Sequence, residues 1–455
     1  MNRRLKIRIN QLVAITVNVA ALIIVIAIQN LTRTLWGSIS LGIYVVVFIY
    51  NTLTMYKIKR RWNSFVFVMY ALICLFHLSQ IYFCVINYED YYCIFSRMNF
   101  DVCQDAFTFA FVCIHVMMIF FFISYKNNNR SKYFVSSCVM KKTDQSLIKI
   151  LFSFFFVLKI LVRLYWMYVG IKLGYLALLA AMSSLTSTIV MVSDVFSIVF
   201  LNNCCTYRDR KKFIFIFIII EVVFMSSGSR ILGITYILLL LIFVLFSQNK
   251  NGKRLSLNYK ILIVIAGIAL VLIVPAISEN RFSSGSIFSL DYVKNSNVIN
   301  SILKEFGMTI LNLVVEISNK TKIEFYHGLS YYGGIVSLVP NIGGFYNSIN
   351  DKLFYVSQLK DLFYYSYGGS NIAEAYINFG YLGFLIFIPA GVIVAKIEKI
   401  LDKIKLESAA SQLFIVALVY EMILWNRSYF FQMLRLPVWV CLAYYIIRNL
   451  IVKKG

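Results

Sequence analysis

The residues that could do chemistry are few, and three of them are arginines at the ends of long apolar segments. Arg230 ends the short turn SSGSR, Arg281 lies in SENRFSSGS, and Arg427 lies in LWNRSYF. A guanidinium group stays charged and presents a planar set of donors that fits phosphate oxygens. Arg230 also stands at the predicted start of a helix, where free backbone N–H groups favour an anion. Together the three arginines predict a diphosphate-binding site, although each alone could be an ordinary arginine at a membrane interface.

Two further residues are candidates for proton transfer. His327 precedes GLSYYGG, and an imidazole with a pKa of about 6.5 can accept a proton from a hydroxyl group. Glu374, in SNIAEAYINFGYLG, could orient a hydroxyl group or take its proton. The alternatives are a hydrogen-bonded loop histidine and a carboxylate favoured at a helix start. The other two histidines, His77 and His115, are far apart in the sequence, and no motif for a metal or a nucleotide is present.

Another group of charged residues lies inside the apolar segments, namely Lys159, Arg163, Asp194, Glu221 and Arg435. A charge at the centre of a membrane costs about 2.5–3.5 kcal/mol, so each of these residues needs a partner or a water-filled cavity. Glu221 is the deepest, in FIFIFIIIEVVFM. We expect an interhelical salt bridge or a protonated carboxyl group there, with Arg163 as a plausible partner. The functional alternative is a proton relay or a cavity wall.

The composition indicates the class of protein that must position these residues. Of the 455 residues, 60% are hydrophobic and only 14% are charged, against about 25% charged in soluble domains. The chain is therefore predicted to be an all-α polytopic membrane protein. The net charge of +24 comes from short basic clusters between the apolar segments, which fits anionic lipid better than nucleic acid. Cys93 and Cys103 share one predicted external connection, where a disulfide and two free thiols are both compatible with the sequence.

The apolar segments predict about twelve transmembrane helices. They cover residues 11–30, 37–56, 64–86, 105–125, 147–168, 175–200, 213–228, 231–247, 258–278, 376–396, 408–425 and 430–450. Alternate connections carry clusters of Lys and Arg, such as 57–61, 208–212 and 396–405. The short connections between them carry one basic residue each, namely Arg33, Arg97, Lys172, Arg230 and Arg427. Because basic residues gather on the cytoplasmic side, both termini are predicted to be cytoplasmic.

One connection is much longer than the rest and divides the chain into three parts. Residues 1–278 would hold spans one to nine, 279–375 one large external loop, and 376–455 the last three spans. Within the loop, apolar residues at helical spacing predict an amphipathic helix over 297–318, which could lie in the membrane interface or cover a cavity. The stretch 328–346 is rich in Gly and Tyr and is predicted to be a packed loop with little regular structure.

These features resemble a known family. Twelve spans, cytoplasmic termini and a late external loop are similar to the bacterial O-antigen and capsule repeat-unit polymerases of the Wzy type. The local matches are SGSR at 227–230, HGLSYYGGIVSLVPNI at 327–342 and AEAYINFGYLGFLIF at 373–387. The resemblance implies a GT-C-like fold and a metal-independent glycosyltransferase without a cofactor. Such an enzyme moves a growing glycan from undecaprenyl diphosphate to the non-reducing end of an incoming lipid-linked repeat unit, on the external face of the bacterial inner membrane.

On this hypothesis Arg230, Arg281 and Arg427 bind the diphosphate, and His327 or Glu374 is the candidate base. The partners would be undecaprenyl-diphosphate-linked oligosaccharide and membrane lipid, with a chain-length regulator as a further candidate and no nucleic acid. An O-antigen ligase would share the arginines and the large loop. A lipid-linked oligosaccharide flippase would also have about twelve spans, but internal repeats and charged cavities at mid-membrane are typical of transporters.

Overall fold

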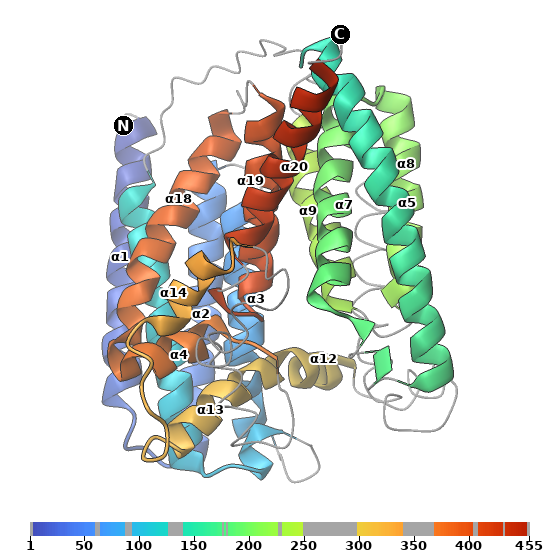
Figure 1. The fold of residues 1–455 in the computed structure, drawn as a ribbon. Coiled ribbons are helices and arrows are strands. Elements are labelled where there is room, and N and C mark those ends of the chain that lie inside the picture. Colours follow the sequence, from blue (N-terminus) through green and yellow to red (C-terminus); the bar gives the residue numbers. More distant parts are fainter. Residues whose placement is uncertain are drawn as a thin grey trace. The chain divides into compact units, whose positions relative to one another are not determined.

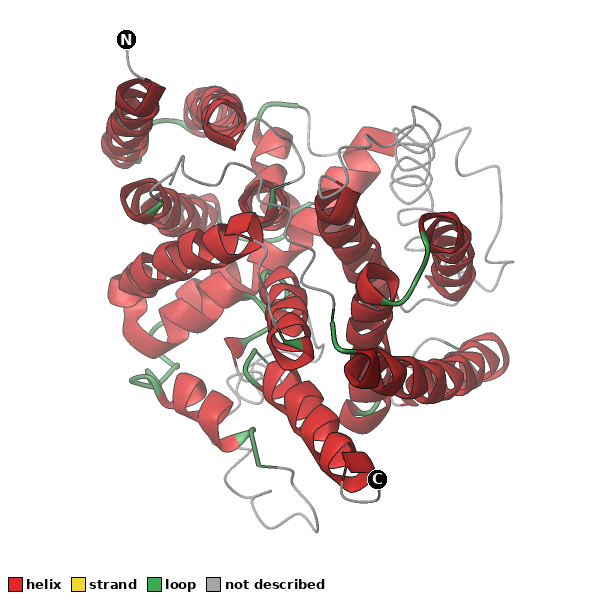
Figure 2. Cartoon of the chain, turned by 90° about the horizontal axis from the view of Figure 1, so that it is seen from above, coloured by secondary structure: helices red, strands yellow, loops and turns green. Residues whose placement is uncertain are grey.

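The computed structural model describes most of the chain as helices. The described residues are 3–59, 64–86, 93–125, 140–174, 177–178, 181–225, 230–248, 298–339, 368–403, 408–430 and 433–452. Within these ranges the structure has helices and loops and no strand, as Figures 1 and 2 show. The prediction of an all-α protein is confirmed for this part of the chain.

The helices have the following bounds. They are α1 (Arg3–Ala27), α2 (Arg33–Lys59), α3 (Phe65–Leu78), α4 (Phe100–Ser124), α5 (Lys142–Leu173), α7 (Ser184–Asn203), α8 (Tyr207–Met225), α9 (Arg230–Gln248), α12 (Val298–Gly307), α13 (Leu311–Ser318), α14 (Leu329–Val336), α17 (Asn371–Phe379), α18 (Phe387–Lys403), α19 (Ala409–Trp425) and α20 (Arg435–Val452). Short 3₁₀ segments follow α3 at Ser79–Cys84, precede α13 at Met308–Ile310 and join α17 to α18 at Gly380–Ile386.

Six segments of the described chain are long and apolar enough to cross a membrane. They are Ile7–Ala27, Arg33–Lys59, Phe65–Cys84, Phe100–Ser124, Leu185–Asn203 and Asn371–Leu401. Each overlaps one of the twelve predicted spans, and the protein is an integral membrane protein. The predicted span 258–278 lies outside the described residues. The total of twelve and the cytoplasmic termini stay predictions.

The chain divides into two compact units, and the first is built around α4. This unit holds Met1–Lys132, Leu303–Lys403 and Trp425–Met433. Helix α4 packs against α1, α13 and α18, and the α18 backbone approaches it closely at Gly391. A Cβ atom at Gly391 would lie 2.3 Å from the carbonyl oxygen of Met117, so glycine is required for this packing distance.

The second unit contains α5, α7, α8, α9, α20 and most of α19. The most extensive helix packing in this unit is between α5 and α7. Two aromatic pairs lie along that contact. The rings of Phe152 and Phe200 stack with centroids 4.2 Å apart, and those of Phe155 and Phe196 stack at 5.5 Å. Such pairs add to the stability that apolar burial gives.

The large connection contains more helix than its sequence predicts. The predicted helix over 297–318 is present as α12 and α13 with a short 3₁₀ segment between them. Residues 311–317 of α13 are buried on every side, so this half is a core helix and does not lie flat on a membrane surface. The prediction of little regular structure over 328–346 is wrong for Leu329–Val336, which form α14. Cys93 and Cys103 are buried free thiols, so they form no disulfide.

Candidate functional site

Glu374 lies in the first turn of α17 and joins three segments of the first unit. Ser370 caps this helix by accepting a hydrogen bond from the Ala373 N–H at 3.2 Å. The Glu374 carboxylate is fully buried. One of its oxygens accepts a hydrogen bond from the Ser330 hydroxyl of α14 at 2.6 Å, and the other accepts one from the Phe430 N–H at 2.7 Å. Both oxygens are therefore engaged in holding neighbouring segments.

Asn378 extends this network from the next turn of α17. Its side-chain N–H donates to the Ser330 hydroxyl at 2.8 Å, and its side-chain oxygen accepts from the Gly328 N–H at 2.9 Å. Its carbonyl oxygen accepts from the His327 N–H at 3.0 Å. Because Glu374 and Asn378 are four residues apart, they lie on one face of α17. This face fixes the backbone of residues 327–330.

His327 is held in an unusual backbone conformation with its side chain exposed. Its φ of 48° falls in the left-handed region, which a residue other than glycine rarely adopts. The following residue, Gly328, has a φ of 90°. The hydrogen bonds to Asn378 stabilise this turn, and the imidazole itself is exposed. The network thus connects the two predicted proton-transfer residues through α17, although the connection runs through the backbone of His327 and not through its ring.

Arg427 lies near the other end of the same network. It is half-buried and interacts with other residues, and it precedes Phe430, whose N–H binds Glu374, by three positions. Helix α17 therefore anchors both the turn that carries His327 and the connection that carries Arg427.

The other two predicted arginines are less fully described. Arg230 is the first residue of α9, as predicted, but its side chain and residues 226–229 are outside the described part of the chain. Arg281 also lies outside it. Arg230 belongs to the second unit and Arg427 to the first, and each unit is described by itself. The convergence of the three guanidinium groups stays a prediction.

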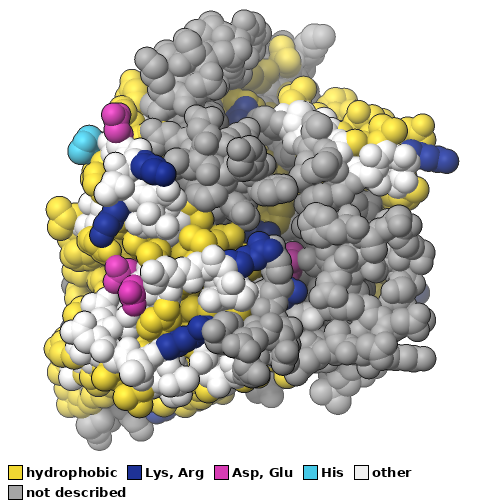
Figure 3. Space-filling view, turned by 90° about the horizontal axis from the view of Figure 1, so that it is seen from below, with side chains coloured by type: hydrophobic (Ala, Val, Ile, Leu, Met, Phe, Trp, Pro, Cys, Tyr) yellow, Lys and Arg dark blue, Asp and Glu magenta, His cyan; other side chains and the backbone are white. Residues whose placement is uncertain are grey.

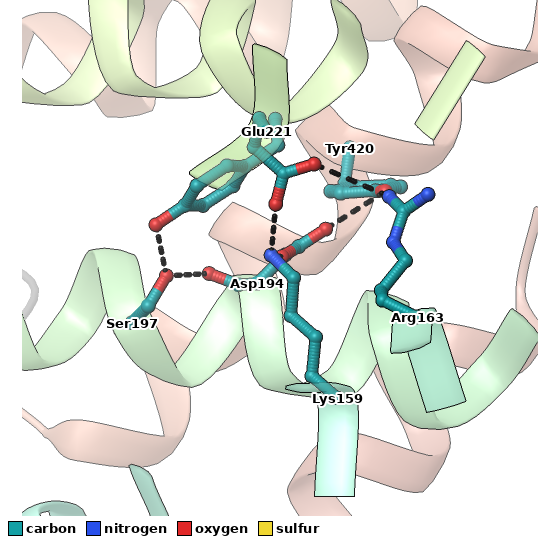
Figure 4. A network of polar contacts seen from close by, with 7 residues as sticks. Lys159, Arg163, Asp194, Ser197, Glu221 and Tyr420 are labelled. Carbon is teal, nitrogen blue, oxygen red and sulfur yellow. Dashed lines mark hydrogen bonds and ion pairs between the residues drawn. The ribbon is translucent and has the colours of Figure 1, made fainter. Parts of the chain in front are cut away.

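Four of the five charged residues predicted inside the apolar segments form one network in the second unit (Figure 4). Glu221 of α8 binds both Arg163, at 3.2 Å, and Lys159 of α5. Lys159 also contacts Asp194 of α7 at 2.5 Å, and Asp194 accepts a hydrogen bond from the Tyr420 hydroxyl at 3.1 Å. The expected partnership between Arg163 and Glu221 is confirmed. Two cations and two anions balance each other here, which is the arrangement that an interhelical salt bridge requires.

This network includes a residue of α8 that closely precedes the predicted SSGSR turn in the sequence. Glu221 is one helical turn before Met225, where α8 ends, and Arg230 begins the next helix. Ser197 extends the network by a hydrogen bond of 2.6 Å to the Tyr236 hydroxyl of α9. The network therefore links both helices that flank the turn. The remaining predicted charge, Arg435, stacks over the Trp439 ring at 4.3 Å.

Several residues with specific polar partners were not singled out by their sequence pattern. Ser330 and Asn378 belong to the motifs HGLSYY and EAYINFG, and the spacing of four between Glu374 and Asn378 is the signal that could have identified the second. Lys59 of α2 pairs with Glu398 of α18 at 2.6 Å. Both lie among basic clusters, where the sequence gives no sign of a specific pairing.

The described residues contain no candidate metal site, and the face seen in Figure 3 carries charges of both signs. On the face seen in Figure 3, basic and acidic side chains both occur among apolar ones, so the charge there is mixed. Among the residues described, no three His, Cys, Asp or Glu side chains are placed to hold a metal ion.

Comparison with known proteins gives one result. No curated protein and no solved structure matches the chain significantly. The family model for the O-antigen polysaccharide polymerase Wzy matches residues 11–455, which is almost the whole chain. Together with the apolar helices, this match identifies a membrane protein of polysaccharide biosynthesis. The chain belongs to the O-antigen polysaccharide polymerase (Wzy) family, whose members act on lipid-linked oligosaccharide repeat units in the membrane.

Proposed function

We propose that this chain transfers a growing glycan from undecaprenyl diphosphate to the non-reducing end of an incoming lipid-linked repeat unit. The observation that carries the proposal is the family match over residues 11–455. The reaction takes place at the external face of the bacterial inner membrane, where the polyprenyl tails stay in lipid and the glycans extend into water. It needs no metal ion and no cofactor.

Arg230, Arg281 and Arg427 bind the diphosphate of the donor. The acceptor hydroxyl forms a bond to the anomeric carbon of the donor glycan while the bond from that carbon to the diphosphate breaks. The diphosphate leaves with the electron pair, so positive charge is needed where its negative charge develops. Guanidinium groups supply that charge and also fix the orientation of the phosphates. The hydrogen bond from the Phe430 N–H to Glu374 anchors the connection that contains Arg427 to α17, which supports a fixed position for this arginine.

His327 takes the proton of the acceptor hydroxyl. Between the two predicted candidates the geometry favours His327, because its imidazole is exposed while both oxygens of the buried Glu374 already accept hydrogen bonds. Glu374 is then a positioning residue that holds the His327 turn and the Arg427 connection. A backbone conformation that is costly on its own is typical of a functional site that the surrounding structure holds in place.

The reaction is tested with purified protein in detergent and synthetic lipid-linked repeat units in the presence of EDTA. We expect a ladder of glycan lengths on undecaprenyl diphosphate. Transfer of a single glycan to a different lipid acceptor would identify a ligase. Translocation of glycolipid across vesicle membranes without any transfer would identify a flippase.

The arginine assignments are tested by substitution. Arg230→Ala, Arg281→Ala and Arg427→Ala should abolish polymer formation without changing the amount of protein in the membrane. The Lys variants should restore only part of the activity, because lysine lacks the planar fork of donors. Arg97→Ala is the matched control, since Arg97 is an exposed arginine on another predicted external connection. Normal polymerisation by the three alanine variants would refute the diphosphate site.

A further inference from the structure

Helix α14 and the turn that follows it have two faces of opposite character. The residues that are buried are all small, namely Ser330, Gly333, Gly334 and Ser337. The exposed ones are large and apolar, with exposed fractions of 48% for Leu329, 57% for Tyr332, 56% for Ile335 and 52% for Val339. This is the reverse of a helix on the surface of a soluble domain, which turns its apolar side inward.

The inner face packs as helices do within membranes. A Cβ atom on Gly334 would lie 2.8 Å from the ring of Phe430, so only glycine allows this approach. The Ser330 hydroxyl is bound to Glu374, and the Ser337 hydroxyl donates to the Gly334 carbonyl oxygen at 2.8 Å. Small residues and locally satisfied hydroxyl groups are typical of helix contacts in lipid.

The outer face continues onto a membrane span. The Phe379 ring, at the end of α17, lies against Gly328 and is parallel to the Tyr331 ring, with centroids 6.2 Å apart. Beyond Phe379, the span Asn371–Leu401 exposes Leu382 and Leu385. Figure 1 shows α14 level with the lower part of α18 and above α13. The exposed apolar residues of α14 therefore join the lipid-facing side of this span.

We propose that residues 329–339 are a re-entrant segment embedded in the membrane, with acyl chains of the bilayer lipid covering its outer face. Four large apolar side chains on one face would be unfavourable in water, and the continuity with the span indicates lipid as their partner. The backbone of the segment suits this environment. The N–H groups of Ser337, Leu338 and Val339 donate to carbonyl oxygens of the preceding turn. The segment thus enters the bilayer directly after His327.

The proposal is tested by photo-crosslinking of the full chain in vesicles of phosphatidylethanolamine and phosphatidylglycerol. The photoreactive residue p-benzoylphenylalanine is placed at Ile335, with Leu382 as a lipid-facing control and exposed Glu324 as a control in the preceding loop. We expect phospholipid adducts at Ile335 in a yield comparable to that at Leu382, and none at Glu324. An absence of lipid adduct at Ile335 would overturn the proposal. So would an adduct to protein, or one that forms only with added polyprenyl substrate.

A second measurement does not depend on crosslinking. A side chain exposed to water tolerates a charge with little effect on stability, whereas one exposed to lipid does not. Ile335→Asp should therefore lower the melting temperature of the protein in vesicles, and the matched variant Glu324→Lys should leave it unchanged. An unchanged melting temperature for Ile335→Asp would contradict a lipid environment. Neither experiment requires polymerase activity, so the outcome is independent of the proposed reaction.

Discussion

Glu316 is a buried carboxyl group without a hydrogen-bond partner among the described residues. It lies in α13, and neither of its oxygens is bonded. Burial raises its pKa well above the usual value, and the nearby Glu374 carboxylate raises it further. Glu316 is therefore protonated in the folded protein under conditions where the unfolded chain has lost that proton.

This difference makes stability depend on pH. Below a pH of about 4.3, Glu316 is protonated in both states and has no effect. As the pH rises above that value the unfolded state ionises first, and stability falls by about 1.4 kcal/mol per pH unit until the folded pKa is reached. Glu316→Gln removes this loss, so the variant should gain stability over the wild type at pH 7 but not at pH 4. Thermal unfolding of the variant and the wild type at pH 4 and pH 7 measures this gain in stability. The control variant Glu324→Gln, at an exposed residue, should show no such gain.

His327 and Glu374 should respond differently to substitution, because one is exposed and the other is buried. His327→Ala should lower the rate of polymerisation by about 10²–10⁴-fold, the usual contribution of a general base, with an unchanged melting temperature. Glu374→Gln should lower both the rate of polymerisation and the melting temperature. The substitution weakens hydrogen bonds to a buried carboxylate, which are each worth about 1.5–3 kcal/mol. Paired rate and melting measurements separate the two roles. A large loss of rate for Glu374→Gln at wild-type stability would favour Glu374 as the base.

The sequence predicts these residues better than it predicts their roles. A carboxylate at the start of a helix can cap, position or catalyse, and only the bonds to Ser330 and Phe430 favour positioning. In the other unit, energetics requires that a buried cation such as Arg163 has an anionic partner. The choice of Glu221 over Asp194 depends on how the helices pack. Lys159 joins this pair because of the way α5, α7 and α8 pack together, and local sequence patterns do not specify that packing.

Among the helices, the contact between α4 and α18 is the most sensitive to a single methyl group. A Cβ atom at Gly391 would meet the Met117 carbonyl oxygen at 2.3 Å and the Phe121 nitrogen at 3.0 Å, and neither backbone atom can move aside alone. Gly391→Ala should therefore destabilise the protein by about 1–3 kcal/mol. Gly42 of α2 has no atom within 4 Å of the same position. Gly42→Ala should stabilise by about 0.5–1 kcal/mol, because alanine favours helix. Thermal unfolding of the two variants tests whether the free energy of unfolding falls for Gly391→Ala and rises for Gly42→Ala.

The same kind of contact explains which elements the sequence identifies. Long apolar runs such as that of α4 predict helices reliably, because only a helix satisfies its own backbone in lipid. Helix α14 is missed because adjacent Gly333 and Gly334 lower helix propensity by about 1 kcal/mol each. In the folded protein these glycines allow close packing on Phe430, and tertiary contact outweighs propensity. The spacing of Leu329, Tyr332, Ile335 and Val339 is the signal that would have identified the helix.

At the scale of the molecule, each unit places a predicted functional segment beside a buried polar network of its own. In the first unit Glu374 and Asn378 support the turn of His327. In the second unit Lys159 binds Glu221 of α8 and lies over the Tyr236 ring of α9, so it contacts the helices on either side of Arg230. A membrane interior offers no water to compensate for misplaced polar groups, so such networks fix helix positions strongly. Chemistry at the membrane surface needs that rigidity, because bound phosphates must meet fixed charges.

The predicted topology is tested by the sides of the membrane on which its connections lie. The basic clusters predict cytoplasmic termini, and a re-entrant α14 returns to the side it came from. The chain before α14 and the chain after residue 367 must then share the external side. Alkaline phosphatase, which is active only outside the cytoplasm, is inserted after exposed Lys322, after exposed Gly368, or fused to the C-terminus. We expect activity at the first two sites and none at the third. If α14 crossed the membrane completely, the insertions at Lys322 and Gly368 would give opposite results, and the large loop could not be a single external segment.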